Sequence, residues 1–370
     1  MSDKKPSLGY NLIKFALFLA VGLGLLYVVY QNQAAGFERE CACKNGCAQP
    51  NLLAKIWADF SGANYFYLAL VAGAFLLSVL SRALRWAILI EPLGYKVRPL
   101  NGFFAIMVGY LINLALPRAG EIAKPALLNQ YEKVPVDKLI GTIVVDRIFD
   151  VIMLLLVLGV SFIVQFDAIM GFLSGETRPT GECVAPQTVE KSAFPWFWLL
   201  VGMGSVALLS LIIIAIKWKQ IQQTAFYAKI KAMALNFWAG MLTVFKLKRP
   251  FMFFFHTFFI WVMYFVMTYV CFWAYGPTLH LSASAAFLAF VFGGFGVLIP
   301  SPGGMGTYQL AVTAALVVYG VNSGDAFAFA NISFFTINIF CNLFFGLLAY
   351  IVLPIYNRNY QPLLPNNPTA

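Results

Sequence analysis

Residues 102–121 have the sequence GFFAIMVGYLINLALPRAGE, an apolar run that stops at Leu116 and is followed at once by Pro117-Arg118-Ala119-Gly120-Glu121. An apolar helix needs about 20 residues to cross the hydrocarbon core of a bilayer, so this run is too short to span one. Short apolar segments that Pro and Gly interrupt are typical of broken or re-entrant helices, whose irregular backbone lines a cavity or is buried in protein. We therefore expect residues 101–130 to form a helical hairpin that dips into the membrane from the cytoplasmic side.

The composition of the whole chain supports a membrane protein. Of its 370 residues, 61% are hydrophobic and 11% are charged, whereas a soluble domain carries about 25% charged residues. We expect one membrane domain over residues 1–357 and a short disordered tail, rich in Pro and Asn, over residues 358–370. The apolar blocks predict an all-α polytopic protein with about six full spans, at residues 10–30, 64–80, 142–165, 195–216, 251–275 and 327–355.

The first apolar block follows Lys4 and Lys5, as a signal peptide would. Its apolar run is longer than a typical signal-peptide core, so we interpret it as a retained anchor. Ala34-Ala35-Gly36 would also suit a cleavage site, and that alternative stays open.

The placement of charge along the chain predicts its topology. The net charge of +10 comes from basic residues that gather in segments 82–98 and 217–249, and basic segments of membrane proteins stay in the cytoplasm. Segments 31–61 and 166–194 carry at least as many acidic residues as basic ones and are expected outside. Both termini are predicted to be cytoplasmic, in the inner membrane of a bacterium. Because topology accounts for the positive charge, we expect no nucleic-acid partner. We interpret residues 217–249 as a basic amphipathic helix on the inner membrane surface.

A second break repeats the pattern of the first. Residues 299–306, IPSPGGMG, share an apolar-Pro-x-x-Gly frame with residues 116–120 and again separate two short apolar arms. A span precedes and follows each hairpin, but the first unit (62–166) begins outside and the second (250–356) begins inside, with 167–249 as connector. This predicts an inverted repeat with two oppositely oriented re-entrant hairpins and a binding site near the midplane. The residues expected to break the helices and permit gating are Pro117, Gly120, Pro300, Ser301, Pro302, Gly303, Gly304 and Gly306.

Charged residues within the predicted membrane region gather in the first unit. Ionisable groups in spans are costly and face a polar cavity or one another. One interpretation is a mixed-charge pocket, in which Arg118, Lys124 and Arg147 hold a lipid phosphate while nearby carboxylates orient these cations or meet a cationic headgroup. The other is a structural ion-pair cluster that fixes the hairpin against the next span. The carboxylates are Glu121, Asp146 and Asp150.

Three further polar residues are candidates for the same site. Asn113 is either a site residue or a partner for the backbone that the break sets free. Arg82 and Arg85, next to Trp86, are interpreted as interface anchors, with contact to a phosphate as the alternative.

Cysteine and histidine usage gives no sign of a catalytic or metal centre. Cys271 and Cys341 lie in apolar spans and are expected to pack there, as are the isolated His256 and His280. We find no metal-ligand set, phosphate-binding loop or nucleophile triad, and we expect neither a cofactor nor enzyme activity. Four cysteines lie in the predicted external loops, where we favour disulfides over a metal or redox site because no His is near. They are Cys41, Cys43, Cys47 and Cys183.

Four motifs occur in order along the chain: Arg82-x-x-Arg85-Trp86, Asn113-x-x-Leu116-Pro117-Arg118-x-Gly120-Glu121, Asp146-Arg147-x-x-Asp150 and Pro300-Ser301-Pro302-Gly303-Gly304-x-Gly306. Together they resemble the flippase-like family related to the transmembrane region of lysylphosphatidylglycerol synthases, over residues 64–353. The resemblance implies a membrane domain that moves lipids between leaflets, aminoacylated phospholipids in the best-known members. It does not imply lipid synthesis, because the aminoacyl transferase of the bifunctional members is a soluble module.

The residues and the resemblance predict a lipid translocase that passes a phosphate-bearing lipid, such as an aminoacyl-phospholipid, through a cavity between the two units. Pro117–Glu121 with Asp146–Asp150 is expected to select the headgroup, and Pro300–Gly306 to form an uncharged opposite wall. Two alternatives stay open: a transporter of a small anionic solute or lipid precursor, and a non-transporting partner of a separate glycosyl- or aminoacyl-transferase. The expected partners are membrane phospholipids, with a homodimer and a separate lipid-modifying enzyme as further candidates.

Overall fold

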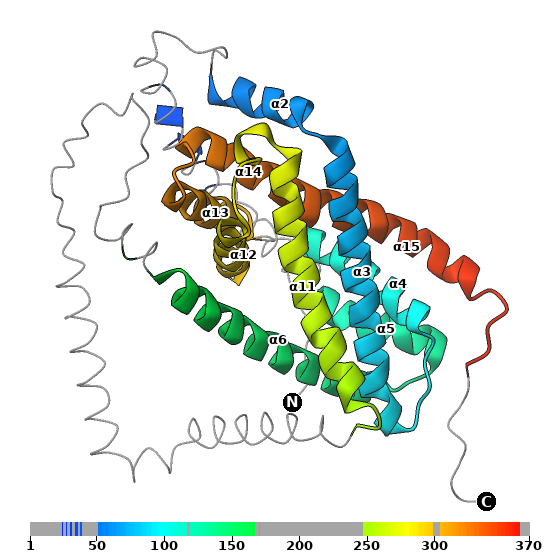
Figure 1. The fold of residues 1–370 in the computed structure, drawn as a ribbon. Coiled ribbons are helices and arrows are strands. Elements are labelled where there is room, and N and C mark those ends of the chain that lie inside the picture. Colours follow the sequence, from blue (N-terminus) through cyan, green and yellow to red (C-terminus); the bar gives the residue numbers. More distant parts are fainter. Residues whose placement is uncertain are drawn as a thin grey trace, which may run out of the picture.

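The computed structural model describes residues 51–116, 119–166, 170, 247–298 and 304–362, together with single residues between 24 and 38. Regular structure in these parts is helical, with no strand, as predicted (Figure 1). Four helices are long and apolar enough to cross a membrane. They are α3 (Tyr65–Ile90) with its extension η1 (Glu91–Leu93), α6 (Val136–Val164), α11 (Pro250–Ala274), and the run of α14 (Ser323–Phe334), η4 (Phe335–Cys341) and α15 (Asn342–Tyr356).

These four helices coincide with the spans predicted at residues 64–80, 142–165, 251–275 and 327–355. The spans predicted at 10–30 and 195–216 lie almost wholly outside the described residues, as does the basic segment 217–249. The prediction that the span 64–80 ends at residue 80 is wrong, because α3 continues to Ile90. Arg82 and Arg85 suggested a membrane interface there, but acidic residues of another helix compensate their charges.

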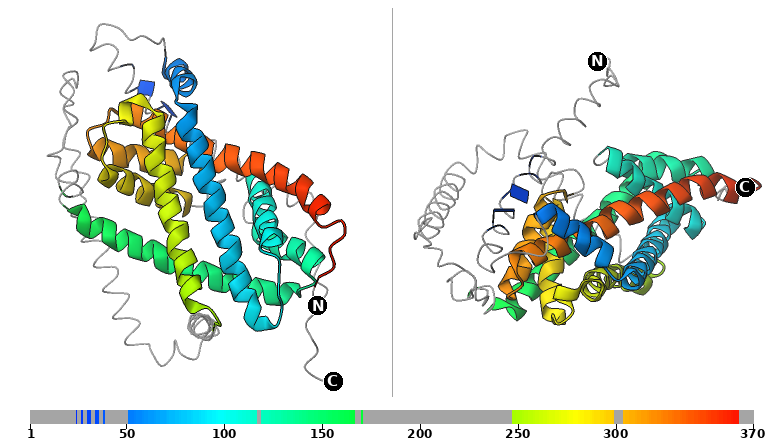
Figure 2. Two further views of the ribbon diagram at one scale, coloured as in Figure 1. Left: turned by 45° about the vertical axis from the view of Figure 1, so that its right-hand side comes forward. Right: turned by 90° about the horizontal axis from the view of Figure 1, so that it is seen from above.

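α3 and α11 form the central pair of the fold and lie side by side (Figures 1 and 2). The N–H of Asn64, which caps the start of α3, donates to the carbonyl of Ala274 at the end of α11 at 2.8 Å. Further along α3, Ser81 Oγ lies 2.8 Å from His256 Nδ1, near the start of α11. The two helices are therefore antiparallel, as expected for one inward and one outward span, and they join the two predicted units.

The first predicted hairpin consists of α4 (Pro99–Ala115) and α5 (Gly120–Glu132), which pack against each other. Their close approach requires glycine, because a Cβ at Gly120 would lie 2.0 Å from the carbonyl oxygen of Gly109. The Gly120 N–H donates to Asn113 Oδ1 at 2.7 Å, so Asn113 satisfies backbone at the break. Pro117 and Arg118 lie outside the described residues.

The second hairpin consists of α12 (Ala283–Leu298) and α13 (Thr307–Val318), which also pack as a pair. Gly304 and Gly306 each have a φ of 83°, in the left-handed region that glycine adopts without strain. The Gly306 N–H donates to Gln309 Oε1 at 2.8 Å, at the start of α13. Pro300–Gly303 lie outside the described residues. The opposite insertion of the two hairpins into the membrane stays a prediction.

A helix that was not predicted, α2 (Leu52–Gly62), lies in the segment assigned to the outside. Asn51 caps it by accepting from the Ala54 N–H at 2.8 Å. Lys55 Nζ lies 2.7 Å from Asp59 within α2 and 2.7 Å from Asp325 near the start of α14. This shared cation ties α2 to the second unit.

The other end of the chain is ordered beyond its predicted limit. The Tyr360 hydroxyl donates to Glu132 Oε2 at 2.8 Å, and the Tyr360 ring centroid lies 3.7 Å from the guanidinium carbon of Arg98. The prediction of a disordered tail from residue 358 is therefore wrong for Tyr360, because these contacts hold it against the first hairpin. α15 also packs against α4, so the last helix crosses from the second unit to the first (Figure 2).

Candidate functional site

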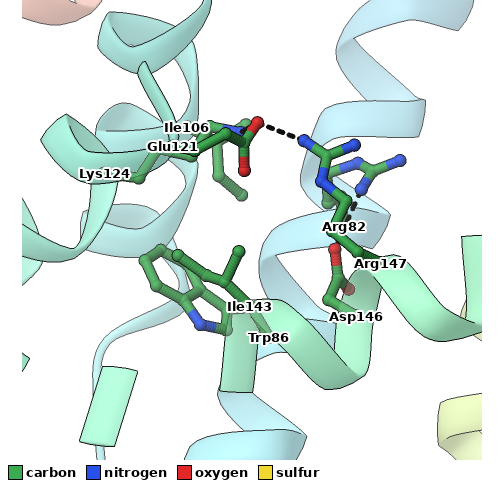
Figure 3. Close-up of a pocket in the computed structure, with 8 residues that line it drawn as sticks. All are labelled: Arg82, Trp86, Ile106, Glu121, Lys124, Ile143, Asp146 and Arg147. Atoms are coloured by element: carbon green, nitrogen blue, oxygen red, sulfur yellow. Dashed lines mark hydrogen bonds and ion pairs between the residues drawn. The ribbon is translucent and has the colours of Figure 1, made fainter. Parts of the chain in front are cut away.

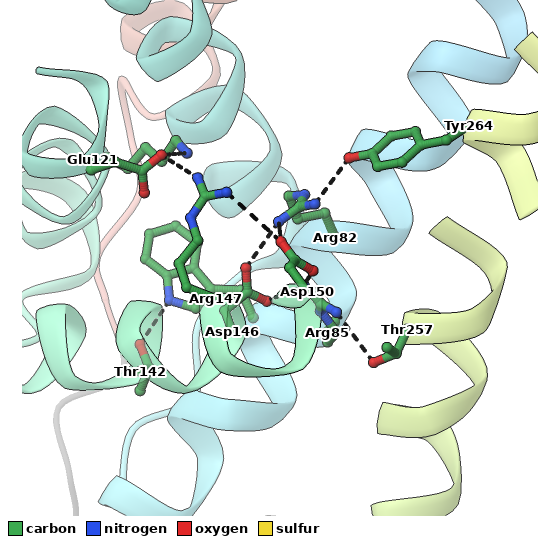
Figure 4. Close-up of polar contacts among 11 residues, drawn as sticks. Arg82, Arg85, Glu121, Thr142, Asp146, Arg147, Asp150, Thr257 and Tyr264 are labelled. Carbon is green, nitrogen blue, oxygen red and sulfur yellow. Dashed lines mark hydrogen bonds and ion pairs between the residues drawn. The ribbon is translucent and has the colours of Figure 1, made fainter. Parts of the chain in front are cut away.

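The charged residues predicted to form the site come together where α3, α5 and α6 meet (Figure 4). Arg82 and Arg85 in α3, and Glu121 and Lys124 in α5, are three positions apart, and in α6 Asp150 lies four positions after Asp146 and three after Arg147. These spacings place the side chains on one side of each helix. Of the charged residues predicted to gather in the first unit, only Arg118 cannot be placed, since it lies outside the described part of the chain. The members of the cluster are Arg82, Arg85, Glu121, Lys124, Asp146, Arg147 and Asp150.

Arg82 and Arg85 are buried, with exposed fractions of 6% and 0%. Their interpretation as interface anchors is therefore wrong. A buried arginine is tolerated where an acid compensates its charge. Here the compensating acids come from α6, and Asp146 lies 64 positions from Arg82 in the chain. Because that pairing depends on how two separate helices pack, the local sequence around Arg82 and Arg85 does not reveal it.

Four residues form what we call the inner ion-pair set: Arg82, Arg85, Asp146 and Asp150. Arg82 Nη1 lies 3.0 Å from Asp146 Oδ2 and 2.9 Å from Asp150 Oδ2. Arg85 Nη2 lies 2.6 Å from Asp146 Oδ1 and 2.7 Å from Asp150 Oδ1. Two cations and two carboxylates make the set neutral, and each carboxylate is already held by both arginines. The structural ion-pair interpretation fits this half of the cluster.

Two residues of α11 that sequence reasoning missed complete the inner set. Arg82 Nη2 donates to the Tyr264 hydroxyl at 2.9 Å, and Arg85 Nη1 donates to Thr257 Oγ1 at 3.2 Å. Their spacing of seven positions places both on one face of α11. That spacing is the available signal, and it is weak because packing residues show the same one. Through these hydroxyls the inner set joins α3, α6 and α11.

The other three members form the outer set, which joins the tip of the first hairpin to α6. Glu121 Oε1 lies 3.0 Å from Lys124 Nζ and pairs with Arg147 Nη2. The Lys124 side chain is 5% exposed, whereas that of Arg147 is 47% exposed. Arg147 Nη1 also lies 3.8 Å from Asp150 Oδ2, which links the two sets. Glu121 Oε2 is buried and has no hydrogen-bond partner.

The cluster encloses a small cavity that we call the charged pocket (Figure 3). It has room for about 20 Å³, which is enough for about one water molecule. Trp86 forms part of its wall and is oriented by its indole N–H, which donates to Thr142 Oγ1 at 2.8 Å. The pocket is lined by Arg82, Trp86, Ile106, Glu121, Lys124, Ile143, Asp146 and Arg147.

A larger cavity, the α5–α6 groove, adjoins the charged pocket. It has room for about 490 Å³, and apart from Glu121 and Arg147 its lining is apolar. Glu121, Ile143 and Arg147 line both cavities. The Glu121–Arg147 pair therefore stands between a polar compartment and an apolar one. The remaining residues that line the groove are Ile122, Ile140, Val144, Ile148 and Val151.

Both cavities lie within the first unit, because their lining residues come from α3, α4, α5 and α6. Gly304 and Gly306, the described part of the second break, line neither, so the expected opposite wall is not found at these two residues. The physical reason is that the buried arginines of α3 hold α6 against them, and the site forms around that contact. Cys271 and Cys341 are buried and free, as expected for packing residues, whereas Cys41, Cys43, Cys47 and Cys183 lie outside the described residues.

Comparison with known proteins places the chain in a family. The profile of the lysylphosphatidylglycerol synthase TM region matches residues 51–344. The chain belongs to this family. The searches of curated proteins and of solved structures with this chain found no match. The region that matches the lysylphosphatidylglycerol synthase TM region includes every residue of the charged pocket and of the α5–α6 groove. Membership of this family and the four apolar helices indicate a multi-pass membrane protein with a lipid-related role.

Proposed function

We propose that this protein moves a phosphate-bearing lipid between the leaflets of the membrane. The observation that carries the proposal is that the charged pocket and the α5–α6 groove adjoin each other and share Glu121, Ile143 and Arg147 as lining residues. A lipid has the same two parts in the same order, a polar headgroup and an apolar chain. A small water-soluble anion would use the pocket and leave the apolar groove without a role.

Arg147 is the residue best suited to meet a phosphate. Its side chain is half exposed and borders both cavities, and a guanidinium donates two parallel hydrogen bonds to phosphate oxygens. The inner ion-pair set has a different part in the proposal. Since the inner ion-pair set is neutral and connects three helices, it holds α6, and with it Arg147, in a fixed position.

Translocation in this proposal involves no chemical step, so the protein is not an enzyme and needs no cofactor. The charged pocket, with room for about 20 Å³, is too small for a lipid headgroup. We therefore propose that this is a closed state and that the hairpin α4–α5 moves relative to α6 to admit the lipid. Oppositely oriented re-entrant hairpins in a bacterial inner membrane, with both termini cytoplasmic, would give the two-sided access that transport requires.

The test is headgroup accessibility in proteoliposomes, measured with phosphatidylglycerol that carries a fluorescent group on one acyl chain. An impermeant reductant added outside bleaches the outer leaflet at once and the inner leaflet only as lipid crosses. We expect wild type to increase crossing, Arg147→Ala to abolish the increase, and Arg249→Ala to retain it. Arg249 is a matched control, because it also pairs with an acid, Glu91, at 3.6 Å but lies outside the cluster.

A wild-type rate equal to that of protein-free liposomes would remove the proposal. Uptake of a small anion without lipid movement would favour a solute transporter instead. Lipid movement that appears only with a co-expressed glycosyl- or aminoacyl-transferase would favour the role of a partner protein.

A further inference from the structure

The charge balance of the cluster identifies what kind of headgroup the site would take. In the described part of the cluster, four cations, Arg82, Arg85, Lys124 and Arg147, face three carboxylates, which leaves one positive charge in excess. Since the inner set is neutral, the excess belongs to the outer set of Lys124, Arg147 and Glu121. An uncompensated charge among apolar helices is costly, and one bound anion of charge −1 would compensate it.

The three carboxylates are already paired with cations of the protein, which disfavours a cationic headgroup. Each of them already has two cations within 3.0 Å or in direct contact: Asp146 and Asp150 share the two arginines of the inner set, and Glu121 has Lys124 and Arg147. Lys124 Nζ lies 3.0 Å from Glu121 Oε1 and 4.9 Å from the centroid of the Tyr110 ring. A further cation brought to this pocket would face the positive groups of Arg82, Lys124 and Arg147. The two carboxylates that line the pocket, those of Glu121 and Asp146, are each already paired with two cations.

The Glu121–Arg147 pair is the contact that an anion would replace. Among the described residues it is the one ion pair that joins α5 to α6. A phosphate oxygen that binds Arg147 replaces the Glu121 carboxylate as its ionic partner. Glu121 then remains paired with Lys124. Glu121 Oε2, buried and without a hydrogen-bond partner, then accepts from a hydroxyl of the headgroup.

We infer that the lipid is a monoanionic phosphodiester with an uncharged, hydroxyl-bearing headgroup, and that its phosphate displaces Glu121 from Arg147 and so releases α5 from α6. This inference rests on the proposed function, since it names the substrate of the same site. It departs from a cationic aminoacyl-phospholipid. The guanidinium of Arg147 is paired first with Glu121 and then with the phosphate. Its positive charge is therefore compensated at every stage, as a charge in an apolar environment requires.

The experiment measures lipid binding and lipid crossing separately, on the full chain. Binding is followed by native mass spectrometry of the purified protein with phosphatidylglycerol (charge −1), phosphatidylethanolamine (charge 0) and lysyl-phosphatidylglycerol (charge +1). Crossing is followed in proteoliposomes with acyl-labelled forms of the same lipids. We expect phosphatidylglycerol to bind about tenfold more tightly than lysyl-phosphatidylglycerol and to cross fastest.

Two variants change the charge of the site in opposite directions. Glu121→Gln raises the excess to two positive charges, so the preference should shift toward phosphatidic acid, a dianionic phosphomonoester. Arg147→Gln removes the excess, so phosphatidylethanolamine should bind as well as phosphatidylglycerol, whereas Arg147→Lys should retain the wild-type order. Elution as a single species on size exclusion, with an unfolding temperature near that of wild type, shows that each variant is folded.

The inference and the proposed function fail in different ways. Equal binding of phosphatidylglycerol and lysyl-phosphatidylglycerol by wild type, or an unchanged order in both charge variants, overturns the inference even if lipid crosses. Selective binding of phosphatidylglycerol without any crossing supports the inference and removes the translocation proposal.

Discussion

Arg85 Nη2 lies 2.7 Å from Asp150 Oδ1, although 65 positions separate the two residues in the chain. Arg85 has no exposed surface. The contact pairs a fully buried arginine with a partly buried aspartate from a different span, so α3 and α6 are held by charge as well as by apolar packing.

Removing one partner of this contact should destabilise the protein strongly. Arg85→Leu leaves two carboxylates with one arginine, and an uncompensated buried charge costs about 3–5 kcal/mol. The double variant Arg85→Leu/Asp150→Leu should lose less than Arg85→Leu alone, because the charges balance again. Unfolding midpoints in detergent measure both. Arg249→Leu, which breaks the exposed Arg249–Glu91 pair, should cost under about 1 kcal/mol; a loss as large as that of Arg85→Leu would contradict the argument from burial.

The tip of the first hairpin should not tolerate a side chain at Gly120. A Cβ there would lie 2.0 Å from the Gly109 carbonyl oxygen, and Gly120→Ala should therefore cost about 1–3 kcal/mol and reduce lipid crossing. Gly159 in α6 is the matched control, since a Cβ at Gly159 meets nothing within 4 Å. Gly159→Ala should be neutral or stabilise the helix by up to about 1 kcal/mol. Equal effects of the two substitutions on the unfolding midpoint would show that the helices do not approach closely at Gly120.

The attachment of α2 should depend on pH through Lys55. Burial acts to lower the pKa of Lys55, but its hydrogen bonds and ion pairs with Asp325 and Asp59 outweigh burial and raise the pKa above its ordinary value of 10.5. A raised pKa means that the stabilisation is fully present below pH 10.5 and disappears as the pH rises past the folded-state pKa.

We therefore expect Lys55→Met to lower the unfolding midpoint at pH 8 and to have little further effect above the raised pKa. Thermal unfolding of wild type and variant across this pH range gives the difference directly. Lys248→Met, at an exposed position, corrects for the general effect of alkaline pH. A difference between wild type and Lys55→Met that is constant with pH would contradict the role of the charge.

The predicted topology has a direct test in intact cells. An impermeant thiol reagent should label Cys183 after mild reduction, because segment 166–194 is predicted to be outside. It should not label a cysteine placed at position 231, in the segment predicted to be cytoplasmic. Labelling of position 231 and not of Cys183 would show that the predicted topology is inverted. Labelling after cell lysis shows that both positions are reactive.

Several features of the fold follow from local sequence alone. The four long helices follow from the length of their apolar runs, because the thickness of the bilayer sets that length. The two hairpins follow from the combination of Pro and Gly at residues 116–121 and 299–306, where it divides an apolar run into two short arms. The charged residues that form the cluster were also visible, because charge is conspicuous in an apolar chain.

Only the tertiary structure decided what those charged residues do. Whether an arginine marks the end of a span or lies buried within one depends on an acid that another helix supplies, and the acids for Arg82 and Arg85 come from α6. For the same reason, the sequence could not predict that the cluster divides into a neutral inner set and a positively charged outer set. Nor could it predict the α5–α6 groove that adjoins the outer set. Sequence determines which groups a helix carries, whereas the energy of a buried charge is determined by the groups that the packing of helices places beside it.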